Sequence, residues 1–276
     1  MSRARSPLFW SGATLVGTLA LIAMLAPVLS PYDPRAVSGP SLVPPSGAHL
    51  LGTNDAGQDI LSQLIWGARS SALVAVLAAG LAVAIGVFVG VGAGLARGWV
   101  DAVAMRVVDV FLAVPALPLL ILVAALLGPS GPIAIAVIIG LAGWPAIARI
   151  VRSQALGVAR RGYVDAARGF GAGRLYLVGR HLVPALGPLI AANFVYWAGT
   201  AVALQAGLAF LGLSDPTEVS WGSVLNRALS HPGVYFTSEW TWWVLPAGLA
   251  ITLAVVGLAF LALALEPGSN PRLRRS

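Results

Sequence analysis

The chain has 276 residues, of which 58% are hydrophobic and only 10% are charged, and its mean hydropathy is +0.87. A soluble domain carries about 25% charged residues, and a chain this apolar would expose more hydrophobic surface than a soluble monomer tolerates. The composition therefore excludes a soluble protein and, despite the net charge of +7, a nucleic-acid-binding protein. It predicts an all-α membrane protein that is surrounded by the lipid bilayer.

Cysteine and lysine are both absent from the chain. Without cysteine there is no disulfide framework and no thiolate metal site. Without lysine there is no P-loop ATPase, because that motif needs its lysine to reach the nucleotide phosphates. We therefore expect no enzyme activity from this chain itself, and any ATP that drives it is expected to bind to another chain.

The gaps between charged residues predict the membrane spans, because a membrane helix needs about 20 consecutive apolar residues. The third charge-free interval, 110–148, contains the turn-forming run Gly128–Pro132 and is therefore divided in two. The sequence thus predicts six transmembrane helices, near 9–29, 70–96, 104–127, 132–157, 185–212 and 241–265. A cleaved signal peptide is the alternative for the first, but its apolar run exceeds the usual signal core of about 7–15 residues.

The distribution of arginine predicts the orientation, because loops rich in arginine stay in the cytoplasm. With the N-terminus inside, 14 of the 17 arginines are cytoplasmic and only Arg35, Arg69 and Arg227 are outside. Both termini are therefore predicted to be cytoplasmic. The predicted organisation is an N-terminal helix plus extracytoplasmic segment (1–69), a five-helix core (70–265) with a long cytoplasmic loop (158–184), and a cytoplasmic tail (266–276).

No catalytic or metal-binding constellation is predicted. His49 and His231 fall outside and His181 inside, so the three histidines cannot share a metal ion, and no cofactor is expected. Gly86, Gly90 and Gly94 form GxxxG steps that let another backbone approach closely. Their partner is either a helix of the same chain or another subunit.

The cytoplasmic loop 158–184 is the most informative segment of the sequence. Asp165 and two alanines are predicted to lie on one short helix, and Gly169, Gly171 and Gly173 to form a hinge to a second one, because glycine accepts a positive φ. Pro184 then begins the next span, where a missing N–H costs little. Two short helices of this kind fit a groove on a partner; a positively charged loop on the membrane surface is the alternative.

This loop resembles the EAA motif of the membrane subunits of ATP-binding-cassette (ABC) importers. In that motif a Gly lies six residues after the Glu, and a Pro lies thirteen residues after the Gly. Asp165 stands at the Glu position and Val183 replaces the usual Leu before Pro, so we expect weakened helix-end contacts rather than lost coupling. The residues to which the resemblance assigns coupling are Asp165, Ala166, Ala167, Arg168, Gly171 and Pro184.

A second stretch, residues 49–62, is similar to the LGTDxxGRDxxS signature of the dipeptide/oligopeptide branch, specifically of the second of its two permeases. Asn54 and Gln58 depart from that pattern. Other matching runs are 67–71, 99–109, 210–213, 220–222, 245–248 and 270–274. The extracytoplasmic signature residues are Leu51, Gly52, Thr53, Asp55, Gly57, Asp59, Trp221 and Gly222.

The resemblance implies a type I ABC importer (MetI-like) permease fold in the bacterial cytoplasmic (inner) membrane. Such a permease forms half of a translocation path for di- or oligopeptides. Its implied partners are a homologous second permease, two cytoplasmic ATP-binding subunits and an extracytoplasmic solute-binding protein, and its implied coupling helix is 165–176. Nickel and glutathione importers share these motifs, so the substrate stays open.

A self-sufficient secondary transporter or channel is the competing class. It would favour inverted repeats with interrupted helices, or ionisable residues near the membrane midplane, and the sequence shows neither. Candidate pore residues are Asn193, Tyr196, Thr200 and Gln205. Segments 49–69 and 214–240 are predicted to face the binding protein, although an interfacial aromatic belt is an equal alternative for Trp240, Trp242 and Trp243.

Overall fold

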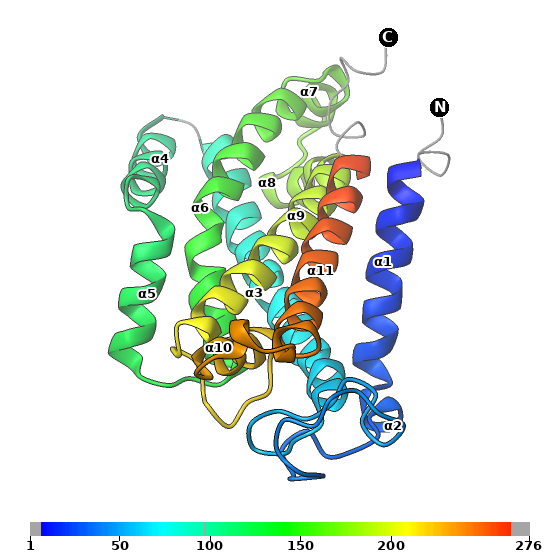
Figure 1. Ribbon diagram of the computed structural model, residues 1–276. Helices are drawn as coiled ribbons and strands as arrows, with labels where there is room; N and C mark the ends of the chain where they lie inside the picture. Colours follow the sequence, from blue (N-terminus) through cyan, green and yellow to red (C-terminus); the bar gives the residue numbers. More distant parts are fainter. Residues whose placement is uncertain (1–6, 97, 266–276) are drawn as a thin grey trace.

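The computed structural model describes residues 7–96 and 98–265, and every regular element in that part of the chain is a helix (Figure 1). Five helices are long and apolar enough to cross a membrane, or six if the bent pair α4–α5 counts as one span. The all-helical prediction is therefore confirmed. The predicted tail 266–276 lies outside the described residues.

The elements follow one another as α1 (Pro7–Met24), α2 (Ala26–Leu29), α3 (Ile60–Ala96), α4 (Gly98–Ala113), α5 (Ala116–Leu127), α6 (Pro132–Ala159), α7 (Gly162–Gly169), α8 (Arg174–Leu177), the π-helix η2 (Val178–Leu182), α9 (Val183–Phe210), α10 (Trp221–Ser230), the 3-10 helices η3 (Val234–Phe236) and η4 (Glu239–Thr241), and α11 (Val244–Leu265). In Figure 1, α7 lies at one end of the bundle, together with the start of α1 and the end of α11. The opposite end, with α2, α10 and the connection 30–59, is called the α10 end below.

Helices α3 and α6 form the centre of the bundle, and glycine explains how closely they pack. A Cβ atom on Gly90 would lie 2.6 Å from the carbonyl oxygen of Ala148, and one on Gly86 would lie 2.7 Å from Cβ of Ile147. Both distances are too short for any larger residue, so the helix backbones meet there. The partner of this GxxxG run is thus α6 of the same chain.

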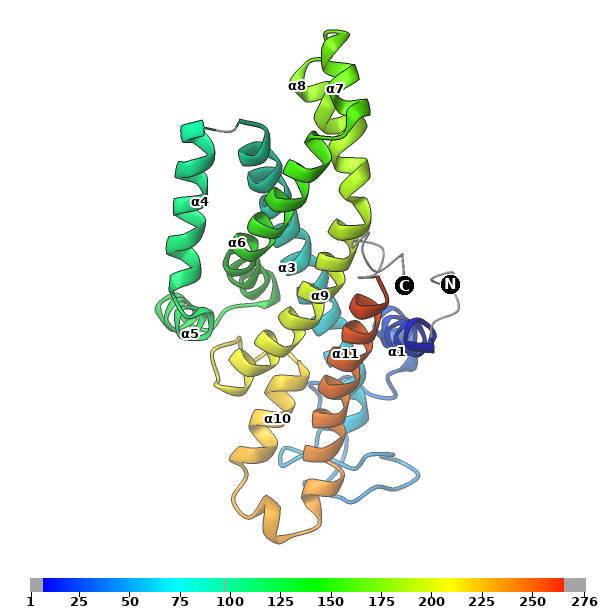
Figure 2. The same cartoon turned by 90° about the horizontal axis from the view of Figure 1, so that it is seen from above.

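Helix α9 packs against α3 and α11, and α1 packs on the outer side of α11 and α3 (Figure 2). The contact between α1 and α11 again uses glycine, since a Cβ on Gly12 would lie 2.9 Å from the carbonyl oxygen of Gly257. Small residues let helices approach in a setting where lipid provides no hydrophobic drive between them. The first helix is therefore an integral part of the bundle.

The segment 104–127, predicted as one continuous helix, is broken in the structure. The chain forms two helices there, α4 and α5, whose axes are bent by 81°. Pro115 lies at the break; it has no N–H to donate and disfavours helical backbone at Val114 before it. Two ion pairs, Arg152–Asp101 and Arg149–Asp109, hold α4 against α6.

The second predicted helix begins ten residues earlier than expected, at Ile60 rather than at residue 70. The carboxylate of Asp59 accepts hydrogen bonds from the backbone N–H and the hydroxyl of Ser62, at 2.8 and 2.7 Å. A carboxylate in this place satisfies N–H groups that a helix start leaves without partners. The predicted boundary at 69/70 therefore falls inside α3.

Candidate functional site

The loop between α6 and α9 is a rigid helix–turn–helix at the α7 end of the bundle. Helix α7 ends in a Schellman-type turn: Gly171 N–H donates to the carbonyl of Arg168 at 2.9 Å, and Ala172 N–H donates to the carbonyl of Ala167 at 3.0 Å. Gly171 has φ +86°, a conformation that only glycine adopts readily. The segment 165–176 thus runs from α7 through the glycine turn into α8, which confirms the predicted hinge between two short helices; its role in coupling stays a prediction.

Buried side chains fix this loop to the bundle. Val164 from α7, Leu177 from α8 and Leu182 from η2 are at most 3% exposed. They pack in one cluster with Ala155 and Val158 near the end of α6. Because each half of the loop has its own apolar anchor, the loop moves with α6 and α9 rather than independently of them.

The predicted coupling residues occupy different parts of this loop. The Asp165 carboxylate accepts a hydrogen bond from Arg168 at 3.1 Å, and Arg168 also donates to the carbonyl of Ala159 at 3.4 Å. Ala166 and Pro184 are exposed, whereas Ala167 is half-buried in the cluster. The Asp165–Arg168 pair therefore links α7 to the end of α6 rather than standing free.

Sequence reasoning did not single out the most exposed apolar side chains of the loop. Phe170 is 93% exposed and Leu175 is 88% exposed, on either side of the Gly171 turn, and Tyr176 is exposed as well. The signal in the sequence is a Phe and a Leu that flank a glycine-rich turn outside any span. Large apolar side chains held out by a rigid loop indicate a surface that another protein covers.

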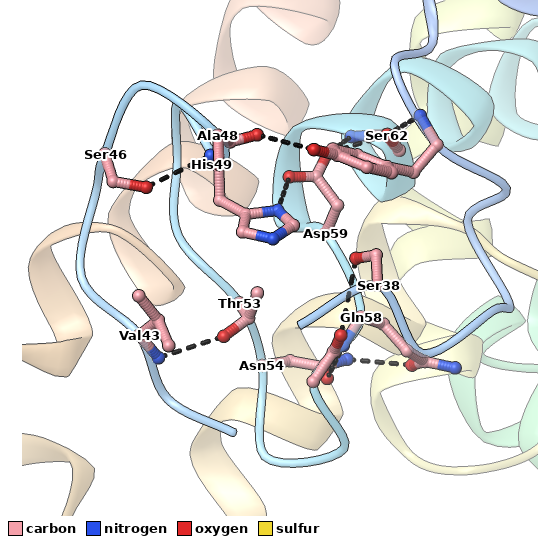
Figure 3. Close-up of polar contacts among 12 residues, drawn as sticks. Ser38, Val43, Ser46, Ala48, His49, Thr53, Asn54, Gln58, Asp59 and Ser62 are labelled. Atoms are coloured by element: carbon pink, nitrogen blue, oxygen red, sulfur yellow. Dashed lines mark hydrogen bonds and ion pairs between the residues drawn. The ribbon is translucent and has the colours of Figure 1, made fainter. Parts of the chain in front are cut away.

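The segment 30–59 forms a compact lobe at the α10 end (Figure 3). The imidazole Nδ1 of His49 lies 3.0 Å from Oδ1 of Asp59, and both side chains are at most 7% exposed. Tyr32 stacks beside His49 with ring centroids 4.9 Å apart, and its hydroxyl donates to the carbonyl of Ala48. The carboxylate that starts α3 thus also holds the lobe together.

The signature residues of the lobe are mainly interior. The Thr53 hydroxyl donates to the carbonyl of Pro40 at 2.7 Å and accepts from Val43 N–H at 2.9 Å, and Thr53 is fully buried. Gly52 and Gly57 have φ +71° and +74°, and a side chain on either would meet the backbone of Val43 or Gly39. These residues define the shape of the lobe and are not available for contact with another protein.

Helix α10 is attached both to the lobe and to the helices of the bundle. Arg227 of α10 donates to the carboxylate of Asp55 at 2.6 Å and to the side chain of Gln58 at 3.0 Å. Trp221 is 3% exposed, and its indole N–H donates to the carbonyl of Leu64 in α3 at 2.9 Å. Gly222 lies directly against the backbone of Ala206. The structure therefore brings the separated signature residues together at this end of the bundle.

Comparison with known proteins identifies the family. A model of the family described as "Binding-protein-dependent transport system inner membrane component" matches residues 82–275. The chain belongs to this family.

Three relatives extend the similarity over almost the whole chain. A Brucella suis biovar 1 protein named as a peptide permease is 34% identical over 280 residues, which cover 99% of this chain and 91% of that protein. A second protein of that organism, named as a peptide transport system permease, is 35% identical over 276 residues (96% and 88%). An Escherichia coli K12 protein named as a D,D-dipeptide transport permease is 33% identical over 257 residues (91% and 83%).

The chain is thus a permease subunit of a binding-protein-dependent importer, a multi-pass membrane protein and not an enzyme. Such a system also includes a substrate-binding protein and an ATPase. In the permease, Tyr196 is exposed on α9 and Thr200 is half-exposed one turn further on, but Gln205 is only 4% exposed. Gln205 is turned towards Ser70 of α3, at 3.4 Å, so it does not share a pore-facing surface with Tyr196.

Exposure also divides the aromatic residues at the α10 end of the permease. Trp242 and Trp243 are at most 9% exposed and belong to a core cluster with Ile60 and Val224, so they do not form an interfacial belt. Tyr235 and Phe236, at 64% and 95%, are the most exposed aromatic side chains of the same connection, and Trp240 is 40% exposed, so the belt alternative stays open for Trp240 alone. The two tryptophans are buried because the lobe covers them.

The connection between α9 and α10 carries the only acid of the permease's described loops whose pKa is clearly displaced. The hydroxyl and the backbone N–H of Thr217 both donate to Asp215 Oδ1, at 2.7 and 2.8 Å, and hold the pKa of that carboxyl below its usual value, with a smaller contribution from Arg35. The backbone N–H of Asp215 also donates to Ser130 at 3.0 Å. The carboxylate thus orders the turn of the connection, and the backbone N–H of the same residue attaches the connection to the segment before α6.

Proposed function

We propose that this permease carries short peptides across the bacterial inner membrane, as half of a translocation path that it forms with a homologous second permease. In this proposal the α7 end faces the cytoplasm and two ATP-binding subunits, and the α10 end faces the extracytoplasmic binding protein. The arginine asymmetry supports the orientation. The names of the relatives, which include peptide and D,D-dipeptide permeases, support the substrate.

The observation that carries the coupling proposal is the pair of apolar residues Phe170 and Leu175, the most exposed apolar side chains of the loop, while Val164 and Leu177 anchor the loop from inside. We infer that they enter an apolar groove of an ATP-binding subunit. Because Val164 and Leu177 anchor the loop, displacement of the groove would be passed to α6 and α9 as rigid-body motion. Asp165, Arg168 and Gly171 would then act by shaping the loop, and Phe170 and Leu175 by contact.

Replacement of Phe170 by Ser tests the docking contact. Phe236 is 95% exposed at the opposite end, so Phe236→Ser is a control with the same change in side chain and the same exposure. Removing a buried anchor from an interface costs about 2 kcal/mol or more. We therefore expect Phe170→Ser to reduce co-purification of the ATP-binding subunits at least tenfold at unchanged membrane level, and Phe236→Ser to leave it intact. Equal co-purification of the two variants would contradict the contact.

Uptake measurements test the substrate. Cells that express the whole importer are supplied separately with a labelled dipeptide, with labelled glutathione and with nickel. We expect uptake of the dipeptide alone, lost in Phe170→Ser. Uptake of nickel or glutathione instead would show that the permease serves one of the related importers, and would leave the docking proposal untouched.

The binding protein is proposed to contact the exposed residues of the α10 end, such as Leu50, Tyr235 and Phe236, rather than the signature itself. The signature residues Thr53, Asp59 and Trp221 are at most 3% exposed and have their partners within the chain. They would stabilise the fold of the lobe and of α10, and thereby hold the exposed contact residues in position. This refines the predicted contact segments 49–69 and 214–240 to their exposed positions.

A further inference from the structure

A cavity of about 630 Å³ lies at the α10 end, between the segment that follows α2, the first part of α3 and the start of α6. It is large enough for a small polar molecule. Four charged residues line it, two acids and two arginines: Asp33, Glu218, Arg35 and Arg69. Their formal charges sum to zero, but two of them form an ion pair with each other and the other two do not.

Arg35 and Glu218 satisfy each other. The guanidinium of Arg35 lies 3.5 Å from the Glu218 carboxylate, and its Nε donates to the carbonyl of Thr217 at 2.8 Å. Neither group needs a ligand. The charge available to a ligand therefore comes from the other two residues.

Arg69 has no hydrogen bond or ion pair within residues 7–96 and 98–265; its guanidinium carbon lies 5.4 Å from the ring centre of Trp66, in cation–π contact. Such stacking orients the planar group and leaves its N–H donors free for an anion. The Asp33 carboxylate accepts only the backbone N–H of Arg35, at 2.8 Å, and its second oxygen has no partner in the described chain. The cavity thus presents the N–H donors of the Arg69 guanidinium and one oxygen of the Asp33 carboxylate to a ligand.

A neutral polar group adjoins these charges. Ser70 lines the cavity and accepts a hydrogen bond from the amide of Gln205 at 3.4 Å. The Gln205 side-chain oxygen is buried, and no donor in the described residues reaches it. A buried amide oxygen without a donor costs about 1–3 kcal/mol. Ser70, whose hydroxyl also has a proton to donate, is thus the neutral polar group that the cavity presents beside its charges.

We propose that this cavity binds a zwitterion, whose anionic group pairs with Arg69 and whose ammonium group pairs with Asp33. Two sources have this chemistry. One is a short peptide with both termini free, which is zwitterionic at neutral pH; this source rests on the proposed function. The other is a phosphatidylethanolamine headgroup from the surrounding leaflet, which combines a phosphate with an ammonium group and does not depend on the transported substrate.

The test uses the full-length permease in nanodiscs of phosphatidylcholine, with dialanine as the probe and calorimetry or saturation-transfer NMR as the readout. Dialanine amide lacks the carboxylate and N-acetyl-dialanine lacks the ammonium group. We expect each of them to bind about five- to tenfold more weakly than dialanine, because each loses one charge-assisted contact. Arg69→Gln should bind dialanine with the same loss and no longer distinguish it from its amide, and Asp33→Asn should no longer distinguish it from the acetylated form.

A second arm identifies the lipid source. Nanodiscs that contain phosphatidylethanolamine are examined by native mass spectrometry. We expect the wild-type permease to retain this lipid, or to bind dialanine, in an Arg69-dependent way. Arg106→Gln, an exposed arginine on α4 away from the cavity, is the matched control and should bind as the wild type does. Arg69 and Asp33 are exposed, so both variants should keep the wild-type thermal unfolding temperature.

The proposal is overturned if the wild type binds neither probe, or if Arg69→Gln binds both as well as the wild type does. Retention of phosphatidylethanolamine without dialanine binding supports the site and identifies lipid as its occupant. Failure of dipeptide uptake in cells, with Arg69-dependent binding preserved, would overturn the proposed substrate and not the site.

Discussion

The backbone conformation of Gly171 sets the positions of Phe170 and Leu175, the two residues of the proposed docking contact. Its φ of +86° closes the turn between α7 and α8, and the space where a Cβ would lie is open. The demand for glycine is therefore conformational and not steric. An L-residue in this region costs about 1–2 kcal/mol, enough to favour another turn and to displace Phe170 from Leu175.

The first prediction follows from that geometry. Gly171→Ala should insert into the membrane normally but co-purify less of the ATP-binding subunits and lose most peptide uptake. Gly173→Ala is the matched control, because Gly173 has φ −70° and equally open surroundings, and it should retain both properties. Unchanged uptake in Gly171→Ala would show that the turn tolerates rearrangement.

The two departures from the family signature contact each other. The Asn54 side-chain amide donates to the Gln58 side chain at 2.9 Å, and Oδ1 of Asn54 accepts the backbone N–H groups of Ala56 and Gln58. The signature has Asp and Arg at these positions. The change therefore replaces a pair of opposite charges by a pair of amides, and the lobe keeps its hydrogen bond although the charges are gone.

Among the elements, α4 depends most on electrostatics. It packs mainly against α3 and α6, and most of its apolar side chains, including Val103 and Val107, are exposed. Arg152 donates to Asp101 through two nitrogens, in the bidentate manner that makes arginine–carboxylate pairs strong. The side chains of this pair are 29% and 16% exposed, so water screens the attraction only in part.

The second prediction tests that attachment. Asp101→Asn should lose about 1–2 kcal/mol of α4 docking, seen as faster amide hydrogen exchange across residues 98–113 with α6 unchanged. Arg106→Gln alters an exposed arginine on the same helix and should leave exchange as it is. The exchanged pair Asp101→Arg with Arg152→Asp should recover part of the protection; no recovery would indicate that packing, rather than charge, attaches α4.

The elements also show which features the sequence could predict. Long apolar runs define α3, α6, α9 and α11 because membrane helices need little beyond apolarity and length. The bend at Pro115 was not predicted, because a proline inside an apolar run is compatible with a kinked span as well as with a sharp break. The early start of α3 was missed because residues 60–69 contain polar side chains, such as Ser62 and Gln63, which are buried only through contact with the lobe.

For the candidate coupling site, the sequence predicted which loop to consider, but not which of its side chains are exposed or buried. The spacing of Asp165 and Gly171 was enough to identify the loop, because a sequence motif depends only on residues that are close together in the chain. The exposure of Phe170 and the inward turn of Gln205 depend on which face of a helix meets the bundle, and that is decided by residues far away in the sequence. The burial of Trp242 likewise depends on Gly52, about 190 positions earlier, which leaves room for its ring.

At the scale of the whole molecule, one helical rod joins the two ends of the permease. Helices α8, η2 and α9 form a continuous stretch, Arg174–Phe210, of 37 residues. The π-turn η2 lies where the rod leaves the docking loop, with Tyr163 and Tyr176 on either side of His181 at centroid distances of 5.7 and 5.6 Å. One residue more or less at this point turns the rest of the rod by about 100° relative to the loop.

The third prediction removes Gly179, which lies in the π-turn with open space around it. The deletion should preserve docking of the ATP-binding subunits but abolish peptide uptake, because the Tyr196 face of α9 would point elsewhere. An alanine inserted after Leu182 on the same background restores the residue count and should restore uptake. Normal uptake in the deletion variant would show that the α9 face is not set by η2.

The length of this rod has a mechanical consequence. At about 1.5 Å per residue it is about 55 Å long, nearly twice the thickness of the hydrocarbon layer, so a single helical stretch is long enough to connect the docking loop with the α10 end. Its far end is attached to α10 through the backbone contact of Gly222 with Ala206. If α9 rotates about its contact with α3, a displacement of Phe170 in one direction would move the lobe in the opposite direction. One continuous helix would then transmit the movement of the ATP-binding subunits to the other side of the membrane.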